Sequence, residues 1–338
     1  MPLIPYLHQV AERRDLAAAD AQAAMGIILA GQATPSQIAA FLVALRMKGE
    51  SVSELVGFAR AMRQAAKAVR VEGSEPLIDT CGTGGDGGGT FNISTVAGFA
   101  IAGAGVRVAK HGNRSISSRC GSADLMESLG VKISLDPGEM ARAIQEVGIA
   151  FLFAPAIHTA MKHAQPVRLE LKMRTAFNLL GPLTNPAGAT AQLVGAPSET
   201  AAELMAGALA ELGLPRGFVV HGSDGLDEIT TTGATLVFEV RAGKVERRCF
   251  EPGHFGVAPA KLEDLAGGDI ETNRDIALSV LSGERGPRRD IVLVNASAAL
   301  VAAGRARDFL EGMALAADSI DTGAARDRLD RLVRFTAG

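Results

Sequence analysis

Residues 82 to 95 read Gly-Thr-Gly-Gly-Asp-Gly-Gly-Gly-Thr-Phe-Asn-Ile-Ser-Thr, with six glycines in the first eight positions. Glycine loses more conformational freedom on folding than any other residue, so this run lowers the stability of the fold. Such a run is expected where the backbone must approach a ligand or another segment closely. Leu77-Ile78-Asp79, just before it, is typical of a short strand, and Asn92 to Thr95 can cap a helix of small residues from Val96 to Ala104. The stretch therefore predicts a strand, a glycine loop and a helix, the opening unit of an α/β sheet.

The glycine loop is best interpreted as a cradle for an anion. Gly82, Gly84 and Gly87 match the spacing of a dinucleotide-binding loop, but two further glycines delay the helix, and Lys110-His111 stands where an acid should hold the ribose. No Lys-Ser/Thr pair follows the glycines, which excludes a nucleoside triphosphate P-loop. What remains is a set of backbone N–H groups and a helix N-terminus that can bind phosphate.

Two more polar stretches follow predicted strands, where open α/β sheets bind their ligands. Lys110 to Arg119 contains three cations and three hydroxyls and follows the predicted strand Val106 to Ala109. The second stretch carries Asp227-Glu228 and follows the predicted strand Phe218 to His221. Two donor-rich loops predict a ligand with more than one phosphate, and the adjacent carboxylates predict magnesium held together with those phosphates.

The rest of the chain indicates two domains. Capping boxes at Thr34-Gln37 and Ser51-Glu54 begin amphipathic helices within the first seventy residues, and a third at Asp136-Glu139 begins another helix. Strands are expected at Ile149 to Phe153 and Leu236 to Val240, and more helix at Thr159 to Leu180, interrupted at Pro166. We predict an α/β protein with a small helical domain and a larger α/β domain whose central sheet is mainly parallel and flanked by helices.

Composition excludes several classes of protein. The 338 residues carry a net charge of −3, and aromatic residues make up 4% with no Trp, so we expect no nucleic-acid partner. The longest apolar run, Val96 to Val106, has about half of the roughly 20 residues that a membrane span needs, and the N-terminus does not resemble a signal peptide. Cys81, Cys120 and Cys249 lack metal-ligand spacing and are expected to be reduced, buried thiols in a cytoplasmic protein.

Together these stretches resemble the anthranilate phosphoribosyltransferases over essentially the whole chain. Besides the three loops, the resemblance rests on Gly121-Ser122-Ala123-Asp124 and on Leu180-Gly181-Pro182-Leu183-Thr184-Asn185-Pro186. It implies transfer of the phosphoribosyl group of 5-phosphoribosyl 1-pyrophosphate to the amine of anthranilate, with release of pyrophosphate, in tryptophan biosynthesis. It also implies Mg²⁺ as cofactor and a homodimer formed through a helical domain of residues 1–70 with about 163–180, beside an α/β domain of residues 71–162 with 181–338.

The resemblance also implies roles for individual residues. Magnesium would be bound by Ser94, Asp227 and Glu228, and anthranilate by Gly82, Asn113, His158 and Arg168. The residues expected to bind phosphoribosyl pyrophosphate are Gly82, Gly85, Asp86, Thr90, Asn92, Ile93, Ser94, Thr95, Lys110, His111, Gly112, Asn113, Arg114, Ser115, Ile116, Ser117, Ser118 and Ser122.

The mechanism so implied needs no nucleophilic side chain, because the neutral amine attacks a ribose carbon that becomes oxocarbenium-like as pyrophosphate leaves. Small departures from the family pattern occur at Gly87 to Gly89, at Cys120 and at Met161. A pyrimidine nucleoside phosphorylase is the rival enzyme, but it would work without the acidic pair and the tandem glycines. A relative that only binds nucleotides or nucleic acid is the other alternative, and the intact set of phosphate and metal residues argues against it.

Overall fold

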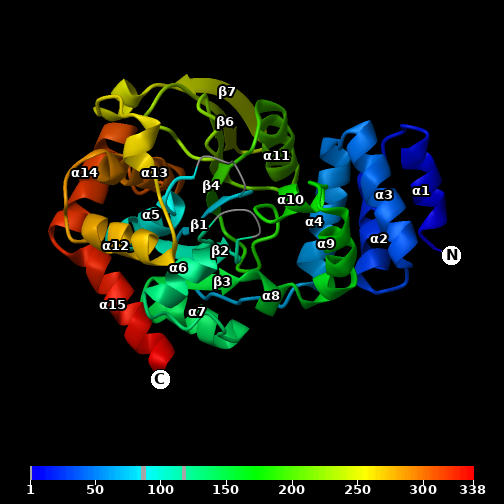
Figure 1. Ribbon diagram of the computed structural model, residues 1–338, viewed down its shortest axis with the longest axis horizontal. Helices are drawn as coiled ribbons and strands as arrows, with labels where there is room; N and C mark the ends of the chain where they lie inside the picture. Colours follow the sequence, from blue (N-terminus) through cyan, green and yellow to red (C-terminus); the bar gives the residue numbers. More distant parts are fainter. Residues whose placement is uncertain (1, 85–88, 116–118) are drawn as a thin grey trace.

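Four helices at the N-terminus form a bundle at one end of the molecule (Figure 1). The computed structural model describes residues 2–84, 89–115 and 119–338. The bundle consists of α1 (Ile4–Ala11), α2 (Ala18–Leu29), α3 (Pro35–Lys48) and α4 (Val52–Ala65). The capping boxes predicted at Thr34 and Ser51 are both present, because in each the cap side chain and the third helical residue exchange hydrogen bonds. Gly49 ends α3 with φ 89°, a conformation that favours glycine.

The segment that precedes the fourth strand returns to this bundle. It comprises η1 (Thr159–His163), α9 (Gln165–Leu171) and α10 (Phe177–Leu180), whose buried side chains Val167, Phe177 and Leu180 share one apolar cluster with α2 to α4. The helical stretch is interrupted next to Pro166, as expected, because η1 ends at His163 and α9 begins at Gln165. Pro166 lies in the first turn of α9, where no N–H is needed, and α9 ends at Leu171, just before Lys172 with φ 48°.

A seven-stranded sheet, counted over the described residues, forms the centre of the larger domain, and its strand order is β3-β2-β1-β4-β5-β6-β7. The first five strands in that order are parallel, and β6 and β7 add an antiparallel hairpin beside β5. The mainly parallel sheet predicted from the sequence is confirmed. The strands are β1 (Leu77–Gly82), β2 (Arg107–Gly112), β3 (Ile149–Phe153), β4 (Ala191–Gly195), β5 (Arg216–Gly222), β6 (Thr235–Arg241) and β7 (Lys244–Phe250).

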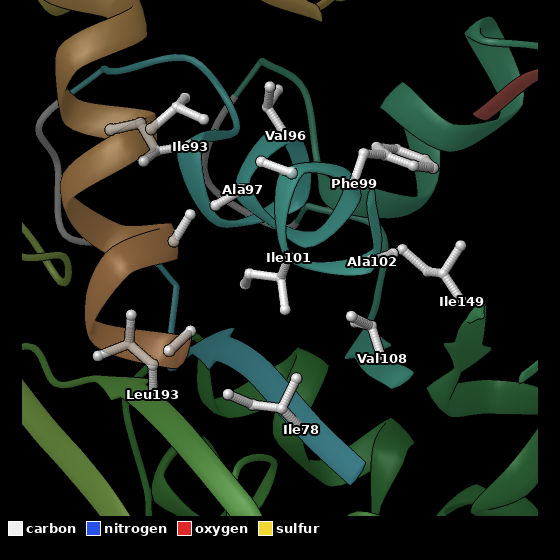
Figure 2. Packing of buried hydrophobic residues seen from close by; sticks show 14 of the residues in the cluster. Ile78, Ile93, Val96, Ala97, Phe99, Ile101, Ala102, Val108, Ile149 and Leu193 are labelled. Atoms are coloured by element: carbon white, nitrogen blue, oxygen red, sulfur yellow. The ribbon is translucent and has the colours of Figure 1, made fainter. Parts of the chain in front are cut away.

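Helices cover both faces of the sheet (Figure 1). Because side chains alternate along a strand, Leu193 and Phe218 face the cluster around α5 and α13, whereas Val194 and Val219 face the cluster of α11 and the bundle. Figure 2 shows α5 above β1, with Ile78, Val108, Ile149 and Leu193 packed on its side of the sheet. The remaining helices are α5 (Ile93–Gly103), α6 (Ser122–Ser128), α7 (Pro137–Glu146), α8 (Ala154–Ile157), α11 (Glu199–Glu211), η2 (Pro252–Phe255), η3 (Leu262–Leu265), α12 (Ile270–Leu281), α13 (Pro287–Ala302), α14 (Phe309–Asp321) and α15 (Ala324–Ala337).

Three local features differ from the sequence predictions. Asn92 occupies the N-cap position of α5, but its side chain does not cap the helix and donates instead to the carbonyl of Cys120 at 3.1 Å. No strand is expected from the sequence at β4, whose five residues, the polar Gln192 among them, are all buried. Cys81 and Cys120 are buried free thiols as expected, whereas Cys249 is exposed because it lies on the edge strand β7.

Among the described helices, none combines the length and apolar character that a bilayer span requires.

Candidate active site

The sequence-predicted loops meet at the point where the sheet reverses its order. From β1 the chain adds β2 and then β3 on one side, and afterwards β4 and β5 on the other side. Such a switch point, at the carboxyl ends of the strands, is where open α/β sheets bind ligands. Gly82 ends β1 and Gly195 ends β4, and a Cβ atom at either position would collide with Asp227. These two glycines therefore let the loop after β5 lie directly on the switch point.

The acidic pair, Asp227 and Glu228, contacts Gly84 and the start of α5. Gly84 belongs to the glycine segment, residues 82–89, of which 82–84 and 89 are described. Asp227 accepts a hydrogen bond through Oδ2 from the backbone N–H of Gly84 at 2.9 Å. Glu228 accepts one through Oε1 from the backbone N–H of Ser94 at 3.1 Å. The N–H of Ser94 lies in the first turn of α5. It therefore has no hydrogen-bond partner within the helix and carries part of the positive charge at the helix N-terminus. Two carboxylates, the backbone of Gly84 and a helix N-terminus thus converge, as an anion site with a bound cation requires.

Lys110 is buried between these groups. Its ammonium group donates to the carbonyl of Thr80 and lies 3.3 Å from Oγ of Ser94. Burial lowers the pKa of Lys110, while the nearby carboxylates of Asp79, Glu228 and Asp227 oppose that shift. The lysine therefore ties the ends of β1 and β2 to the entrance of α5, and supplies positive charge beside the acidic pair.

A buried carboxylate beneath the site holds the end of β2 in place. Asp79 accepts hydrogen bonds from the backbone N–H of His111 at 3.0 Å and from Nδ2 of Asn185 at 2.8 Å. Asn185 also donates to the carbonyl of Ala109 at 2.9 Å. Desolvation raises the pKa of Asp79, and the hydrogen bonds together with Lys110 oppose that shift. The sequence analysis did not find this role for Asp79 and Asn185, because the pairing joins residues more than a hundred positions apart.

Two histidines line the site as neutral groups. His111 Nδ1 lies 3.1 Å from the carbonyl of Gly181, and its ring meets that of His158 edge-on with centroids 5.1 Å apart. Burial lowers the pKa of His111 to about 3 and that of His158 to about 4. His111 therefore takes part in the site as a neutral hydrogen-bonding ring and not as a cation.

The polar loop after β2 packs against the start of α6. Ser122 Oγ lies 3.3 Å from the N–H of Asn113 and 3.2 Å from its carbonyl, which joins the two ends of the loop. The guanidinium of Arg114 pairs with Asp124 and Glu127 on α6, at 2.8 and 2.6 Å. In this structure Arg114 thus stabilises the loop against α6, and its charge is shared with two carboxylates.

Several buried polar atoms at the site have no hydrogen-bond partner among the described residues. They include Oγ1 of Thr83, Oδ1 of Asn92, Oγ1 of Thr95, and Nε2 of both His111 and His158. Buried polar groups are nearly always paired, so a cluster of unpaired ones indicates a place where a polar ligand completes the hydrogen bonding.

The other sequence-predicted residues lie at varied positions. Thr90 forms an isolated bridge with Ala266, and the side chain of Ile93 is buried in the core. Gly112 ends β2, and Ser115 follows in the same polar loop. The remaining residues fall outside the described part of the chain, and these are Gly85, Asp86, Ile116, Ser117 and Ser118.

The side chain of Arg168 contacts residues of the segment that returns to the helical bundle. It is on α9, where its guanidinium donates to Gln165 at 3.2 Å and stacks over the ring of Phe177 at 5.2 Å from the centroid. Burial lowers the pKa of its guanidinium. A different arginine that was not singled out from the sequence, Arg174 in the loop between α9 and α10, donates to the carbonyl of Gly84 and so joins that loop to the end of β1.

Comparisons with known proteins agree along the whole chain. Residues 4–66 match the helical bundle domain of a glycosyl transferase family, and residues 74–326 match the α/β domain of that family. The anthranilate phosphoribosyltransferase of Solibacter usitatus is 68% identical over 339 residues, which cover 100% of this chain and 99% of that protein.

Solved structures give the same result. The crystal structure of anthranilate phosphoribosyltransferase from Thermus thermophilus superposes with a TM-score of 0.94 at 44% identity, over 100% of both chains. The Saccharomyces cerevisiae enzyme in complex with PRPP and Mg has a TM-score of 0.91 at 27% identity, over 99% of this chain and 98% of that one. The same enzyme with 4-fluoroanthranilate has a TM-score of 0.88 at 26% identity and the same coverage.

Proposed function

The chain belongs to the anthranilate phosphoribosyltransferase family, and from that premise we propose how its site carries out the reaction. The enzyme transfers the phosphoribosyl group of 5-phosphoribosyl 1-pyrophosphate to the amine of anthranilate, and it releases pyrophosphate. The observation that carries this assignment is the convergence of Asp227 and Glu228 on the glycine segment and the N-terminus of α5.

The sugar donor binds across the switch point of the sheet. Its pyrophosphate lies against the glycine segment and the first turn of α5. Thr83, Asn92 and Thr95 each have a buried polar atom there without a hydrogen-bond partner among the described residues. Its ribose and 5-phosphate lie along the loop after β2. The donor-binding residues are Gly82, Gly85, Asp86, Thr90, Asn92, Ile93, Ser94, Thr95, Lys110, His111, Gly112, Asn113, Arg114, Ser115, Ile116, Ser117, Ser118 and Ser122.

The residues at the acidic pair fit magnesium. Asp227, Glu228 and the hydroxyl of Ser94 are hard oxygen ligands, which Mg²⁺ prefers. Within the described ranges, no group of three or more His, Cys, Asp or Glu side chains could hold a metal ion by itself. We expect substrate phosphate oxygens to complete the coordination, because proteins usually bind Mg²⁺ with one or two carboxylates together with substrate phosphates. When bound, Mg²⁺ neutralises the charge that develops on the departing pyrophosphate.

Anthranilate binds on the side of the site that faces the helical bundle. Arg168 holds the carboxylate, since a guanidinium grips a carboxylate through two parallel hydrogen bonds. Gly82, Asn113 and His158 line the rest of the acceptor site. His158 is neutral at physiological pH, because burial lowers its pKa to about 4, and it adds no competing charge.

Catalysis then depends on position and fixed charge. The chain supplies no nucleophile, because the aromatic amine is neutral and attacks the ribose carbon directly. Lys110 is held by Thr80 and Ser94, and the α5 dipole has a fixed direction, so neither group reorganises as charge moves toward pyrophosphate. Holding the amine and the sugar together removes much of the entropic barrier.

The chain assembles as a homodimer through a helical domain of residues 1–70 with about 163–180, and the α/β domain comprises residues 71–162 with 181–338. Support for this division comes from the apolar cluster that α9 and α10 share with α2 to α4. Support for the dimer comes from Met47 on α3 and Leu169 on α9, which are 70% and 56% exposed on neighbouring helices. The free thiols at Cys81, Cys120 and Cys249 fit a cytoplasmic location.

A fluorescence assay tests the function. Anthranilate fluorescence should fall when the purified chain is mixed with phosphoribosyl pyrophosphate and Mg²⁺, and it should stay constant when the sugar donor is omitted or Mg²⁺ is chelated. Phosphate-dependent cleavage of a pyrimidine nucleoside, with no loss of anthranilate fluorescence, would instead identify a nucleoside phosphorylase.

A further inference from the structure

The loop that carries the acidic pair is fixed on both sides by residues with no assigned role in the reaction. On the upstream side, Asp224 Oδ1 accepts from the N–H of Leu226 at 3.1 Å, while its other oxygen accepts from the hydroxyls of Thr230 and Thr232 at 2.5 Å each. Leu226 itself is completely buried. The backbone entering Asp227 is therefore held in a closed turn.

On the downstream side, a single side chain from α13 holds Ile229, the residue that follows Glu228. Oδ1 of Asn295 accepts from the N–H of Ile229 at 2.9 Å, and Nδ2 of Asn295 donates to the carbonyl of Ile229 at 2.9 Å. The second hydrogen of Nδ2 goes to the carbonyl of Ile291, one turn earlier in α13. Both backbone groups of Ile229 are thus engaged by one neutral amide.

The surroundings of Asn295 make this contact informative. Asn295 is 0% exposed and stands in the sequence Ile291 to Ala303, which is otherwise apolar except for Ser297. A buried amide is costly unless its donors and acceptor are all paired, and most of that pairing here comes from one loop residue. A hydrophobic side chain would suit the core equally well, so holding Ile229 is what distinguishes asparagine at this position.

We infer that Asn295 is a positioning residue for the magnesium site, and acts by fixing the backbone of Ile229 so that Asp227 faces Gly84 while Glu228 faces the N-terminus of α5. This rests on the proposed function of the acidic pair. Without the clamp, the loop occupies the competent arrangement only part of the time, and the apparent affinity for magnesium falls by that fraction. Asn295 touches neither substrate nor metal.

The test compares two alanine variants on the same helix. Asn295→Ala removes the clamp, and Ser297→Ala is the matched control, since Ser297 is equally buried and donates to the carbonyl of Phe309, away from the acidic loop. Calorimetric titration of phosphoribosyl pyrophosphate at a series of Mg²⁺ concentrations gives a readout that does not depend on turnover. We expect Asn295→Ala to raise the Mg²⁺ concentration for half-maximal binding about tenfold, as expected when one or two buried hydrogen bonds are lost.

The control and a third variant separate the possible failures. Ser297→Ala should lower the thermal unfolding midpoint but leave the Mg²⁺ requirement unchanged. If Asn295→Ala keeps the wild-type Mg²⁺ requirement while Asp227→Asn raises it, the positioning role is overturned and the proposed function stands. If Asp227→Asn is also unchanged, the metal assignment fails, and the role of Asn295 fails with it.

A measurement on the unmutated protein covers the case in which Asn295→Ala does not fold. The amide of Ile229 should exchange with solvent as slowly as the core amides of α13, because both its N–H and its carbonyl are held. The milder variant Asn295→Ser should speed that exchange. Rapid exchange at Ile229 in the unmutated chain would overturn the inference.

Discussion

The loops after β2 and after β5 meet at the same edge of the sheet, but different interactions hold them. The end of β2 is held by buried ionisable groups, namely Asp79 and Lys110 with the neutral ring of His111. The loop after β5 is held by hydrogen bonds within itself and by the amide of Asn295. The first arrangement places ionisable groups deep in the protein, whereas the second combines the carboxylate of Asp224 with the neutral amide of Asn295.

This difference agrees with what each loop has to do. Lys110 must stay charged in a buried place, which requires a compensating carboxylate nearby. Asp227 and Glu228 carry the negative charge that magnesium needs, and the residue that follows them is held by a neutral amide, while the carboxylate of Asp224 that holds the preceding turn is already engaged by Leu226, Thr230 and Thr232. A neutral clamp fixes their position and leaves their charge for the ligand.

The largest effect should follow from removing the buried carboxylate under β2. Asp79→Ala removes one of the carboxylates that offset the burial of Lys110 and leaves the N–H of His111 and the amide of Asn185 without that acceptor, and we expect a loss of about 3–5 kcal/mol in the free energy of unfolding. Denaturant unfolding measures this. Asp136→Ala, which removes an exposed helix cap, is the control and should cost only about 1 kcal/mol. Equal losses in the two variants would show that charge burial does not hold the β2 loop.

A steric change at the other loop should have the next largest effect. In Gly195→Ala the new Cβ collides with the backbone of Asp227. The backbone must shift to remove this collision, which should lower the free energy of unfolding by about 3 kcal/mol. The displaced acidic pair should also raise the KM for phosphoribosyl pyrophosphate. Gly26→Ala is the control, because nothing lies within 4 Å of its Cβ position, and it should be neutral or stabilising. A Gly195→Ala variant with wild-type stability and KM would contradict the close approach.

Both loops serve the sugar donor, so a change at the acceptor site should leave donor binding intact. Arg168→Ala should raise the KM for anthranilate by the equivalent of about 1.5–3 kcal/mol, the usual contribution of hydrogen bonds to a charged group. The KM for phosphoribosyl pyrophosphate should stay nearly constant. Steady-state kinetics with each substrate varied in turn measures both constants. Equal damage to both would mean that another group holds the carboxylate.

Per pH unit, the smallest effect is a pH dependence of stability that arises from His111 at the end of β2. The pKa of His111 in the folded chain is about 3, below the value near 6.5 expected when unfolded. The unfolded state therefore takes up the proton first, and stability present above about pH 6.5 is lost as pH falls toward 3. The slope for this histidine is at most about 1.4 kcal/mol per pH unit. In His111→Gln the free energy of unfolding should fall less steeply between pH 6 and 4 than in the unmutated chain. An unchanged dependence on pH would show that His111 does not contribute to it.

Features encoded locally were predictable from the sequence. The capping boxes at Thr34, Ser51 and Asp136 each lie within four residues, and all three are present. The ends of β1, β2 and β5 could be placed at one edge because parallel strands share their carboxyl edge. The resemblance to a known family added the reaction and the individual roles.

Features that depend on distant parts of the chain could not be predicted in this way. Asp79 with Asn185, and Ile229 with Asn295, are paired across 106 and 66 positions, and neither pair leaves a spacing pattern. β4 was missed because its small residues Ala191 and Gly195 give no alternating pattern. The one available signal for Asn295 was a polar amide inside an apolar helix.

We propose that Asp227 and Glu228 hold magnesium together with the sugar donor. This is tested by titrating phosphoribosyl pyrophosphate binding against Mg²⁺ in Asp227→Asn and Glu228→Gln, which keep the shape of each side chain and remove its charge. We predict a higher Mg²⁺ requirement in both variants and a rate loss worth about 2–4 kcal/mol, comparable to the loss of one transition-state contact. A wild-type Mg²⁺ dependence in both variants would contradict the account.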